Sequence, residues 1–229
     1  MKVILFGSTG MIGQGVLIEC LKDIRIETVL VVNRSSCKVS HPKLKEIIHK
    51  DFFDLSFISN QFSGYDTCFY CLGVTSAGLT EVDYQRNTLE LTTNVAETVL
   101  SLNKNMTFCY ISGAGTDSSE KGKTMWARVK GKTENDLLKK PFKQAYMFRP
   151  GFIQPMNGIK SRTPLYNAMY NIFKPLYFLL KHFDGIVTNT ETLGKAMINA
   201  ATNGFEKNIL ESKDINNIAK QDNSKIFNC

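Results

Sequence analysis

Three glycines spaced three residues apart near the start of the chain have the arrangement of a phosphate cradle. Glycine allows a tight turn at the first position, close approach of the backbone to a pyrophosphate at the second, and close helix–strand packing at the third. The apolar stretch Lys2–Phe6 predicts a strand before them, and apolar residues at helical spacing predict a helix after them. The first turn of that helix would offer free N–H groups and a positive dipole end to an anion. We therefore predict that a dinucleotide binds the run Gly7, Ser8, Thr9, Gly10, Met11, Ile12 and Gly13, with an ordinary strand–turn–helix junction as the alternative.

A second group of polar residues, Asn33, Arg34 and Ser35, stands at the end of the predicted strand Thr28–Asn33. Dinucleotide enzymes selective for NAD usually place an acid at this point, where it accepts hydrogen bonds from the adenosine ribose. No acid stands here, and the Arg34 guanidinium can instead form charge-assisted hydrogen bonds with a 2′-phosphate. NADP is therefore the predicted cofactor in preference to NAD. The alternative is that Arg34 is a surface charge stacked on the adenine.

Two further strand ends supply candidate contacts to the same cofactor. Asp51 can accept a hydrogen bond from the adenine amino group while the backbone or ring of Phe52 covers the base, although a simple turn aspartate fits this position equally well. Leu72 and Gly73 end another predicted strand, where a glycine lets the backbone pass close to a ribose and its phosphates. The alternative for Gly73 is a plain strand-to-loop turn.

The residues 110–115, the residues 126–134 and the run Arg149-Pro150-Gly151 carry a family resemblance. Together with the glycine turn and the run 71–73, they resemble the short-chain dehydrogenase/reductase superfamily of NAD(P)-binding Rossmann proteins. Within that superfamily, the chain is similar to the small atypical branch of Tat-interacting-protein-like oxidoreductases and NAD-dependent epimerase/dehydratase-like proteins. The resemblance covers about residues 1–200.

The resemblance implies a role for each matching residue. Ser112 would orient a substrate carbonyl, Lys130 would hold the nicotinamide ribose, and Pro150 and Gly151 would border the cofactor. The superfamily places a proton-donating tyrosine four residues before the lysine, but this chain has Trp126 there. An indole N–H can donate a hydrogen bond but cannot act as a general acid. The proton would then come from another group, and the candidates are Ser112, Lys130, Tyr166, Tyr170 and a water molecule.

Strands and helices alternate along most of the chain, which predicts an α/β fold with a doubly wound, mostly parallel (Rossmann) sheet and a small C-terminal substrate-side lobe. We expect residues 1–150 to form the dinucleotide-binding core. Residues 151–229 are expected to supply the substrate lobe, a returning helix and the C-terminal tail of one continuous domain.

The expected elements carry three further features. The helix over 81–102 holds Asn87 and Asn94, either of which matches an asparagine that the resemblance places near the site. The aromatic stretch 164–183 is expected to be core, a lid or a dimer surface, with docking on a membrane surface as the alternative. Thr190 is expected to cap a helix over 190–197. Strands are also predicted over 44–49, 66–73, 106–112, 145–148 and 207–211, and a helix over 123–140.

Composition argues against several classes of function. The net charge is +7, but the 28 Lys and Arg residues are spread along the chain without a dense stripe, so we expect no nucleic-acid partner. No apolar run approaches the roughly 20 residues that span a bilayer, and we expect no signal or transit peptide. The six cysteines indicate reduced thiols and a cytoplasmic location. Cys68 and Cys71 lie on a predicted strand and would point to opposite faces, so we predict no metal site.

These observations favour an NADP(H)-dependent oxidoreductase of short-chain type that acts on an unidentified carbonyl or alcohol. Its partners would be the dinucleotide and a small-molecule substrate. Trp126 favours one alternative, a non-catalytic NADPH-binding regulatory or scaffold protein. The second alternative is a nucleotide-sugar epimerase-like enzyme, although the short stretch after Arg149 leaves little room for a sugar-binding domain. A homodimer is compatible with the superfamily, but no residue pattern marks an interface.

Overall fold

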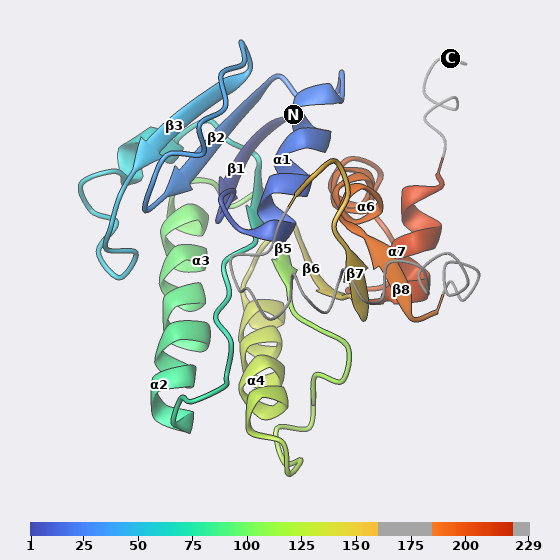
Figure 1. Cartoon of the computed structure of the whole chain (residues 1–229). Coiled ribbons are helices and arrows are strands. Elements are labelled where there is room, and N and C mark those ends of the chain that lie inside the picture. Colours follow the sequence, from blue (N-terminus) through green and yellow to red (C-terminus); the bar gives the residue numbers. More distant parts are fainter. Residues whose placement is uncertain (160–184, 222–229) are drawn as a thin grey trace.

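The computed structural model describes residues 1–159 and 185–221 (Figure 1). A single central sheet separates two layers of helices, and a small second sheet lies beside one of those layers. The aromatic stretch 164–183, with the two candidate proton donors Tyr166 and Tyr170, lies outside the described residues.

The central sheet has seven strands, and every neighbouring pair in it runs parallel. This arrangement confirms the predicted doubly wound α/β fold. In spatial order the strands are β3 (Leu44–Ile48), β2 (Thr28–Asn33), β1 (Lys2–Phe6), β4 (Thr67–Tyr70), β5 (Thr107–Ile111), β6 (Gln144–Arg149) and β9 (Ile209–Glu211). A separate parallel pair joins β7 (Phe152–Gln154) to β8 (Val187–Asn189).

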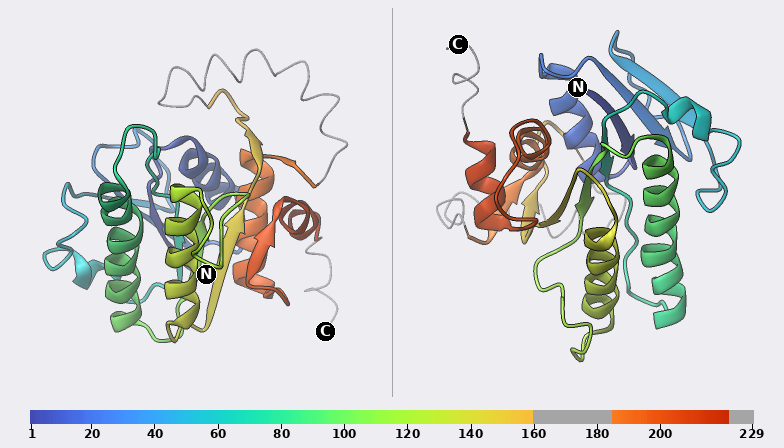
Figure 2. Two further views of the ribbon diagram at one scale, coloured as in Figure 1. Left: turned by 90° about the horizontal axis from the view of Figure 1, so that it is seen from below. Right: turned by 180° about the vertical axis from the view of Figure 1, so that it is seen from behind.

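Helices cover both faces of the sheet, as the two views of Figure 2 show. One face packs against α1 (Met11–Lys22), α6 (Thr190–Asn203) and α7 (Ser212–Ala219). The other face packs against α3 (Leu91–Leu102) and α4 (Met125–Lys139). A short helix α2 (Glu81–Gln85) leads into α3 through a π-helical turn, Arg86–Glu90.

Alternating side chains of each strand enter two separate cores, because successive residues of a strand point to opposite faces. In β1, Val3 and Leu5 lie in the core beneath α1 and α6, whereas Ile4 and Phe6 lie in the core beneath α3 and α4. All four side chains are fully buried. A strand that is buried on both faces is mostly apolar, which explains why the residues 3–6 of β1 are all apolar.

Two expected elements differ from the structure. The helix predicted over 81–102 is continuous in path but contains the π-helical turn, in which the extra residue per turn shifts the face that later side chains present. The cap of α6 is Asn189 rather than Thr190, because the Asn189 side chain accepts the hydrogen bond from the Thr192 N–H. Thr190 is the first residue of the helix, and its hydroxyl accepts from the Met156 N–H instead.

The strand order fixes where a ligand can bind. After β1 the chain builds β2 and β3 on one side, and it later builds β4, β5 and β6 on the other side. The connections after β1 and β4 therefore run to opposite faces of the sheet, which makes the carboxyl ends of these two strands a topological switch point. In open parallel sheets, ligands bind at such a switch point.

Candidate functional site

The glycine turn occupies the carboxyl end of β1, and two of its glycines are required by the fold. Gly7 has a φ of +85°, and a Cβ there would lie 2.9 Å from the Cys71 carbonyl carbon. A Cβ on Gly13 would lie 2.1 Å from the Gly7 carbonyl oxygen. Gly10 differs, because the nearest atom to an added Cβ is the Gly7 oxygen at 3.4 Å. Packing within the protein therefore gives little reason for glycine at position 10, whereas close approach of a ligand gives one.

The N-terminus of α1 is open to an anion. No side chain caps the helix at Gly10, and no acidic residue stands in its first turn. The Thr9 carbonyl accepts a hydrogen bond from the Gln14 side chain at 3.1 Å, which holds the turn against the helix. Thr9, Gly10, Met11 and Ile12 are partly exposed, whereas Ser8 is buried. The exposed turn, free helix end and absent acid match what a pyrophosphate requires.

The backbone after β4 borders the glycine turn, and contact of Leu72 and Gly73 with a cofactor stays a prediction. The contact between Gly7 and the Cys71–Leu72 peptide places this segment directly against the glycine turn. Gly73 is exposed, and a Cβ there would meet no atom within 4 Å. The structure therefore brings the run 71–73 to the switch point between β1 and β4.

The contacts of the turn after β2 differ from those that the sequence predicts. Asn33 is 1% exposed, and its amide is bonded to Ser8 and to Glu46 of β3, so it is not available to a nucleotide. Arg34 and Ser35 are exposed and make no hydrogen bond or ion pair within the described part of the chain. Glu46 is a residue that sequence reasoning missed, because only the pairing of β2 with β3 places it here.

The segment after β3 needs a correction as well. Phe52 is 4% exposed and packs edge-on against Phe6, with ring centroids 5.9 Å apart, so its ring is part of the core and does not cover a base. The neighbouring Phe53 is 39% exposed, with the Arg86 guanidinium 5.1 Å from its ring centroid. Asp51 is exposed and accepts from the Phe53 N–H, as expected of a turn aspartate.

The two candidate asparagines now have distinct positions. Asn94 donates to the carbonyls of Phe52 and Phe53, which fixes the segment after β3 to α3. Asn87 lies in the π-helical turn and donates to the Asp83 carbonyl one turn earlier. Asn94 is therefore engaged in holding the fold, and Asn87 is the one of the two that remains a candidate near the site.

Ser112 and Lys130 meet at the carboxyl end of β5. The Lys130 ammonium donates to the Ser112 carbonyl at 3.1 Å and lies 5.5 Å from the centroid of the Tyr110 ring. Burial lowers the pKa of Lys130 to about 8, against the opposing influence of the nearby Glu134 carboxylate. An amine with such a pKa can exchange a proton near neutral pH, which an ordinary surface lysine cannot do.

The Ser112 hydroxyl has a partner that the sequence did not indicate. Ser112 is 8% exposed, and its Oγ lies 2.9 Å from the Oγ1 of Thr116. The Thr116 hydroxyl donates its single proton to the Gly113 carbonyl at 2.7 Å. Ser112 is therefore the donor in the pair, and it can donate to a substrate only by releasing Thr116. No motif identifies Thr116, because the loop after β5 alone brings the two hydroxyls together.

Trp126 stands in the first turn of α4, one turn before Lys130 and on the same side of the helix. It is partly buried, and its ring lies beside Gly115, where an added Cβ would be 3.6 Å from Cη2. The indole therefore borders the loop that carries Ser112. The assignment of Trp126 to the tyrosine position of the superfamily stays a prediction.

The run 149–151 begins at the last residue of β6 and is hydrogen-bonded to the loop after β5, to α7 and to α4. The buried Pro150 accepts from the Ala114 N–H at 3.0 Å, which places it beside the loop after β5. Gly151 N–H donates to the Ser212 hydroxyl at 2.8 Å. Arg149 forms a buried ion pair with Glu134 of α4, which is fully buried. This pair, which the sequence did not indicate, connects β6 to the helix that carries Lys130.

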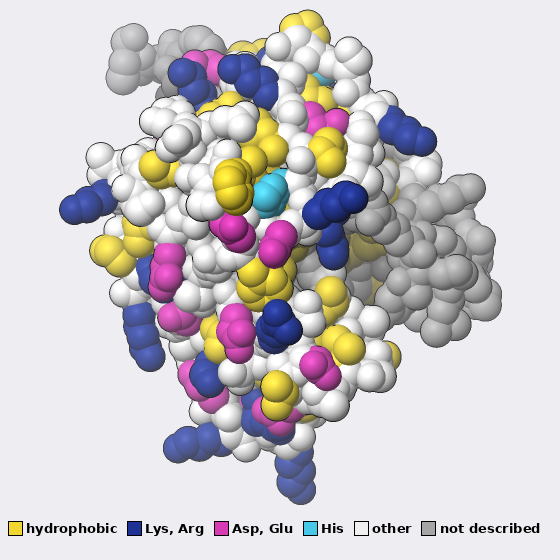
Figure 3. All heavy atoms as spheres, turned by 90° about the vertical axis from the view of Figure 1, so that its left-hand side faces the viewer, with side chains coloured by type: hydrophobic (Ala, Val, Ile, Leu, Met, Phe, Trp, Pro, Cys, Tyr) yellow, Lys and Arg dark blue, Asp and Glu magenta, His cyan; other side chains and the backbone are white. Residues whose placement is uncertain are grey.

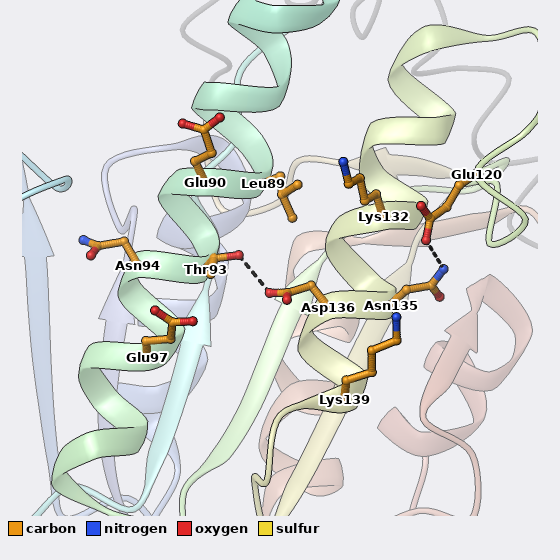
Figure 4. Close-up of a pocket in the computed structure, with 10 residues that line it drawn as sticks. All are labelled: Leu89, Glu90, Thr93, Asn94, Glu97, Glu120, Lys132, Asn135, Asp136 and Lys139. Carbon is orange, nitrogen blue, oxygen red and sulfur yellow. Dashed lines mark hydrogen bonds between the residues drawn. The ribbon is translucent and has the colours of Figure 1, made fainter.

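Surface hollows do not by themselves mark the site. A hollow of about 500 Å³ lies between α3 and α4, and Figure 4 shows its polar lining, with Thr93 bonded to Asp136 and Glu120 to Asn135. Of the candidate site residues, Asn94 alone lines it, and Asn94 holds the segment after β3 to α3. A cavity of about 350 Å³ instead borders Ser8 and Thr9 of the glycine turn and the residues 36–39.

The remaining sequence expectations concern charge, metals and membranes. On the face shown in Figure 3, basic and acidic side chains are intermixed rather than gathered into a stripe. The five cysteines within the described ranges are free thiols, and Cys71 lies just beyond β4 instead of on it. Over residues 1–159 and 185–221, no cluster of three or more metal-ligating side chains occurs. In the same ranges, no helix combines the length and apolar character needed to cross a bilayer.

Comparison with solved structures identifies the fold. WbmF of Bordetella bronchiseptica, solved with NAD+, superposes with a TM-score of 0.65 at 14% identity, covering 94% of this chain and 76% of that chain. MoeE5, solved with UDP-glucose and NAD, gives 0.63 at 16% identity, covering 92% and 75%. A short-chain dehydrogenase/reductase of Saccharomyces cerevisiae gives 0.62 at 13% identity, covering 93% and 96%.

The chain has the Rossmann fold of these proteins. The fold that the resemblance predicts is thereby confirmed, and the atypical branch stays a prediction. No protein-family model matches the chain.

Sequence comparison overturns the predicted location. Protein FMP52, mitochondrial, of Meyerozyma guilliermondii is 26% identical over 162 residues, which span 67% of this chain and 65% of that protein. Protein FMP52-1, mitochondrial, of Scheffersomyces stipitis is 23% identical over 209 residues, covering 90% and 91%. Both relatives are named as mitochondrial proteins, so the prediction of a cytoplasmic location is wrong on this finding. Scattered cysteines favour reduced thiols, but they do not separate one reducing compartment from another.

Proposed function

We propose that this protein is an NADP(H)-dependent oxidoreductase that interconverts a small carbonyl compound and its alcohol. The observation that carries the proposal is the meeting of Lys130 with Ser112 at the same edge of the sheet as the uncapped glycine turn. The glycine turn suits an anionic dinucleotide, and the pair of Ser112 and Lys130 suits the oxygen of a substrate. Their joint placement at the switch point supports a reaction between the two ligands.

The chain's own residues fit a bound dinucleotide. The glycine turn and the free end of α1 would hold the pyrophosphate, and the open backbone at Gly73 would lie along the ribose. Arg34 and Ser35 would take the 2′-phosphate, which is the basis for preferring NADP over NAD. When bound, the cofactor would supply or accept hydride.

The protein must then manage one proton at the substrate oxygen. We assign that proton to Lys130, whose ammonium lies beside Ser112 and whose pKa of about 8 suits transfer near neutral pH. In the direction of reduction, the Lys130 ammonium gives its proton to the substrate oxygen and regains one from solvent. Ser112 positions that oxygen after turning its hydroxyl away from Thr116. Trp126 would border the substrate without exchanging a proton.

The first test is a titration of the purified protein with NADPH and NADH, followed by nicotinamide fluorescence, with Arg34→Ala beside the wild type. Loss of NADPH affinity in the variant, with little change for NADH, supports the cofactor and the 2′-phosphate contact. A screen of carbonyl compounds with NADPH would follow, and the rate should depend on a group that titrates near pH 8. Failure of both nucleotides to bind at millimolar concentration would refute the proposal.

Trp126 supports a second candidate, a protein that binds NADPH without turning it over. It predicts tight binding and no oxidation of NADPH by any carbonyl compound in the screen. An epimerase-like activity on a nucleotide sugar is the third candidate, and the likeness in fold to MoeE5, solved with UDP-glucose and NAD, supports testing UDP-glucose as a ligand.

Three broader properties belong to the same proposal. We place the protein in the mitochondrion, as both named relatives suggest, and fractionation of cells that express a tagged chain would test this. Residues 151–229 would form the substrate side of the same domain. A homodimer is proposed, and light scattering of the purified protein would test it.

A further inference from the structure

The carboxylate of Glu46, in β3, accepts hydrogen bonds from several residues at the proposed nucleotide site. Glu46 Oε1 accepts from the Asn33 amide at 3.2 Å and from the Cys37 N–H at 2.8 Å. Its Oε2 accepts from the Ser36 hydroxyl at 2.8 Å. One side chain thus fixes the turn after β2 at both ends, at Asn33 and at the pair 36–37.

The chain of hydrogen bonds continues into the glycine turn. The Asn33 side-chain nitrogen Nδ2 donates to the Ser8 Oγ at 2.8 Å, and the side-chain oxygen Oδ1 of Asn33 lies 3.1 Å from the same hydroxyl. Ser8 and Asn33 are both buried, at 0% and 1% exposure. Glu46 therefore links the turn that would hold the pyrophosphate to the turn that would hold the adenosine ribose.

Arg34 and Ser35 lie between the two ends of the turn that Glu46 holds. Arg34 and Ser35 are exposed, and within the described residues neither makes a hydrogen bond or an ion pair. Their backbone is held on both sides by groups bonded to Glu46. Fixing the ends of a short turn limits the positions its central side chains can take, which lowers the entropy cost of binding through them.

Glu46 is also better suited to hold the turn than to contact a nucleotide directly. Burial opposes its ionisation, but the hydrogen bonds from Cys37, Ser36 and Asn33 outweigh burial and lower the pKa of Glu46. A carboxylate whose oxygens already accept three hydrogen bonds has little capacity left for ribose hydroxyls. Its negative charge is partly balanced by the same donors.

We propose that Glu46 is the positioning residue for nucleotide choice, because it holds the turn 33–37 so that Arg34 and Ser35 face the 2′-phosphate of NADP(H). The proposal rests on the proposed function, since it assumes that a dinucleotide binds at the switch point. The competing interpretation is that the Glu46 charge repels a 2′-phosphate and selects NAD(H). The two interpretations predict opposite effects of removing the charge.

The experiment compares the dissociation constants of NADPH and NADH for the wild type, Glu46→Ala and Glu46→Gln. Glu46→Gln keeps an acceptor oxygen and gains an N–H that can donate to Ser36, so it can keep the turn without the charge. Glu90→Ala is the matched control, because Glu90 is exposed on the π-helical turn before α3 and makes no hydrogen bond or ion pair among the described residues. Thermal melting of each variant checks that it is folded.

We expect Glu46→Ala to weaken NADPH binding by about tenfold, the loss of one good charge-assisted contact, and NADH binding by less than about threefold. Glu46→Gln should keep the NADPH-to-NADH ratio of the wild type within about threefold, and Glu90→Ala should leave both constants unchanged. An unchanged ratio in folded Glu46→Ala would overturn the proposal, as would an equal loss of both nucleotides. Tighter NADPH binding by Glu46→Gln would overturn it in favour of charge repulsion. If the wild type binds neither nucleotide, the proposed function itself fails, and this inference fails with it.

Discussion

Replacement of Lys130 by methionine should make the protein more stable at neutral pH and remove a pH dependence that is specific to this site. The fall in the pKa of Lys130 from the usual 10.5 to about 8 corresponds to about 3 kcal/mol of unfavourable free energy for holding the ammonium in the folded protein at pH 7. The variant also loses the hydrogen bond to the Ser112 carbonyl and the contact with the Tyr110 ring, which together contribute about 2 kcal/mol. The net gain in the free energy of unfolding at pH 7 is therefore about 1 kcal/mol.

The pH dependence is the stronger part of this prediction, because it follows from the pKa of Lys130 in the folded and unfolded protein alone. Between about pH 8 and pH 10.5 the unfolded Lys130 binds more protons than the folded one, so the stability of the wild type rises with pH in this window. From pH 7 to pH 10 the wild type should gain about 2.5 kcal/mol relative to Lys130→Met. By pH 10 the variant should have become the less stable of the two.

Urea unfolding at several pH values between 7 and 10 measures this difference directly. Lys132→Met is the matched control, because Lys132 lies two residues further along α4, is exposed and should show no such trend. A difference between wild type and Lys130→Met that does not vary with pH would refute the reasoning. It would mean that the ammonium is well solvated, and the assignment of Lys130 as the proton-exchanging group would lose its physical basis.

Three further predictions concern the turn, the indole and the buried ion pair. Gly13→Ala should fail to fold or lose several degrees of melting temperature, measured by circular dichroism, because its Cβ would meet the Gly7 carbonyl at 2.1 Å. Gly10→Ala should fold normally but lose about tenfold or more in nucleotide affinity, measured by fluorescence titration. Trp126→Tyr should raise the rate of NADPH oxidation by any carbonyl compound that the wild type reduces, and an unchanged rate would argue that the indole is not at the proton-donor position. Arg149→Met should destabilise the protein by about 3 to 5 kcal/mol in urea unfolding because Glu134 would be left buried without its partner, and a loss below about 1 kcal/mol would show that the pair is not important for stability.

The glycine turn could be predicted because its requirements are local. A positive φ at Gly7 and the contact of Gly13 with Gly7 arise within seven residues of the chain. The alternation of apolar strands with amphipathic helices is likewise written along the sequence, because a strand buried on both faces is mostly apolar. Lys130 could be placed near Ser112 only through the family resemblance, since nothing local connects a strand end to a helix position 18 residues later.

The contacts that the sequence did not indicate depend instead on distant parts of the chain. Phe52 and Phe53 are neighbours of the same type, and only the packing of β3 against the core decides that the first ring is buried and the second is exposed. Asn33 reads as a polar strand end, but the pairing of β2 with β3 brings Glu46 to it and withdraws it from any ligand. The cap of α6 moved by one residue because Asn189 and Thr190 can both cap a helix, and the surrounding packing selected Asn189.

The sequence by itself therefore determined the succession of strands and helices and the glycine turn after β1, because each depends on neighbours along the chain. The tertiary structure alone decided which groups of different elements touch. It brought Glu46 to Asn33, Thr116 to Ser112 and Glu134 to Arg149. Such contacts depend on strand register and helix docking, which are set by the packing of the whole core and leave no trace in the spacing of the residues themselves.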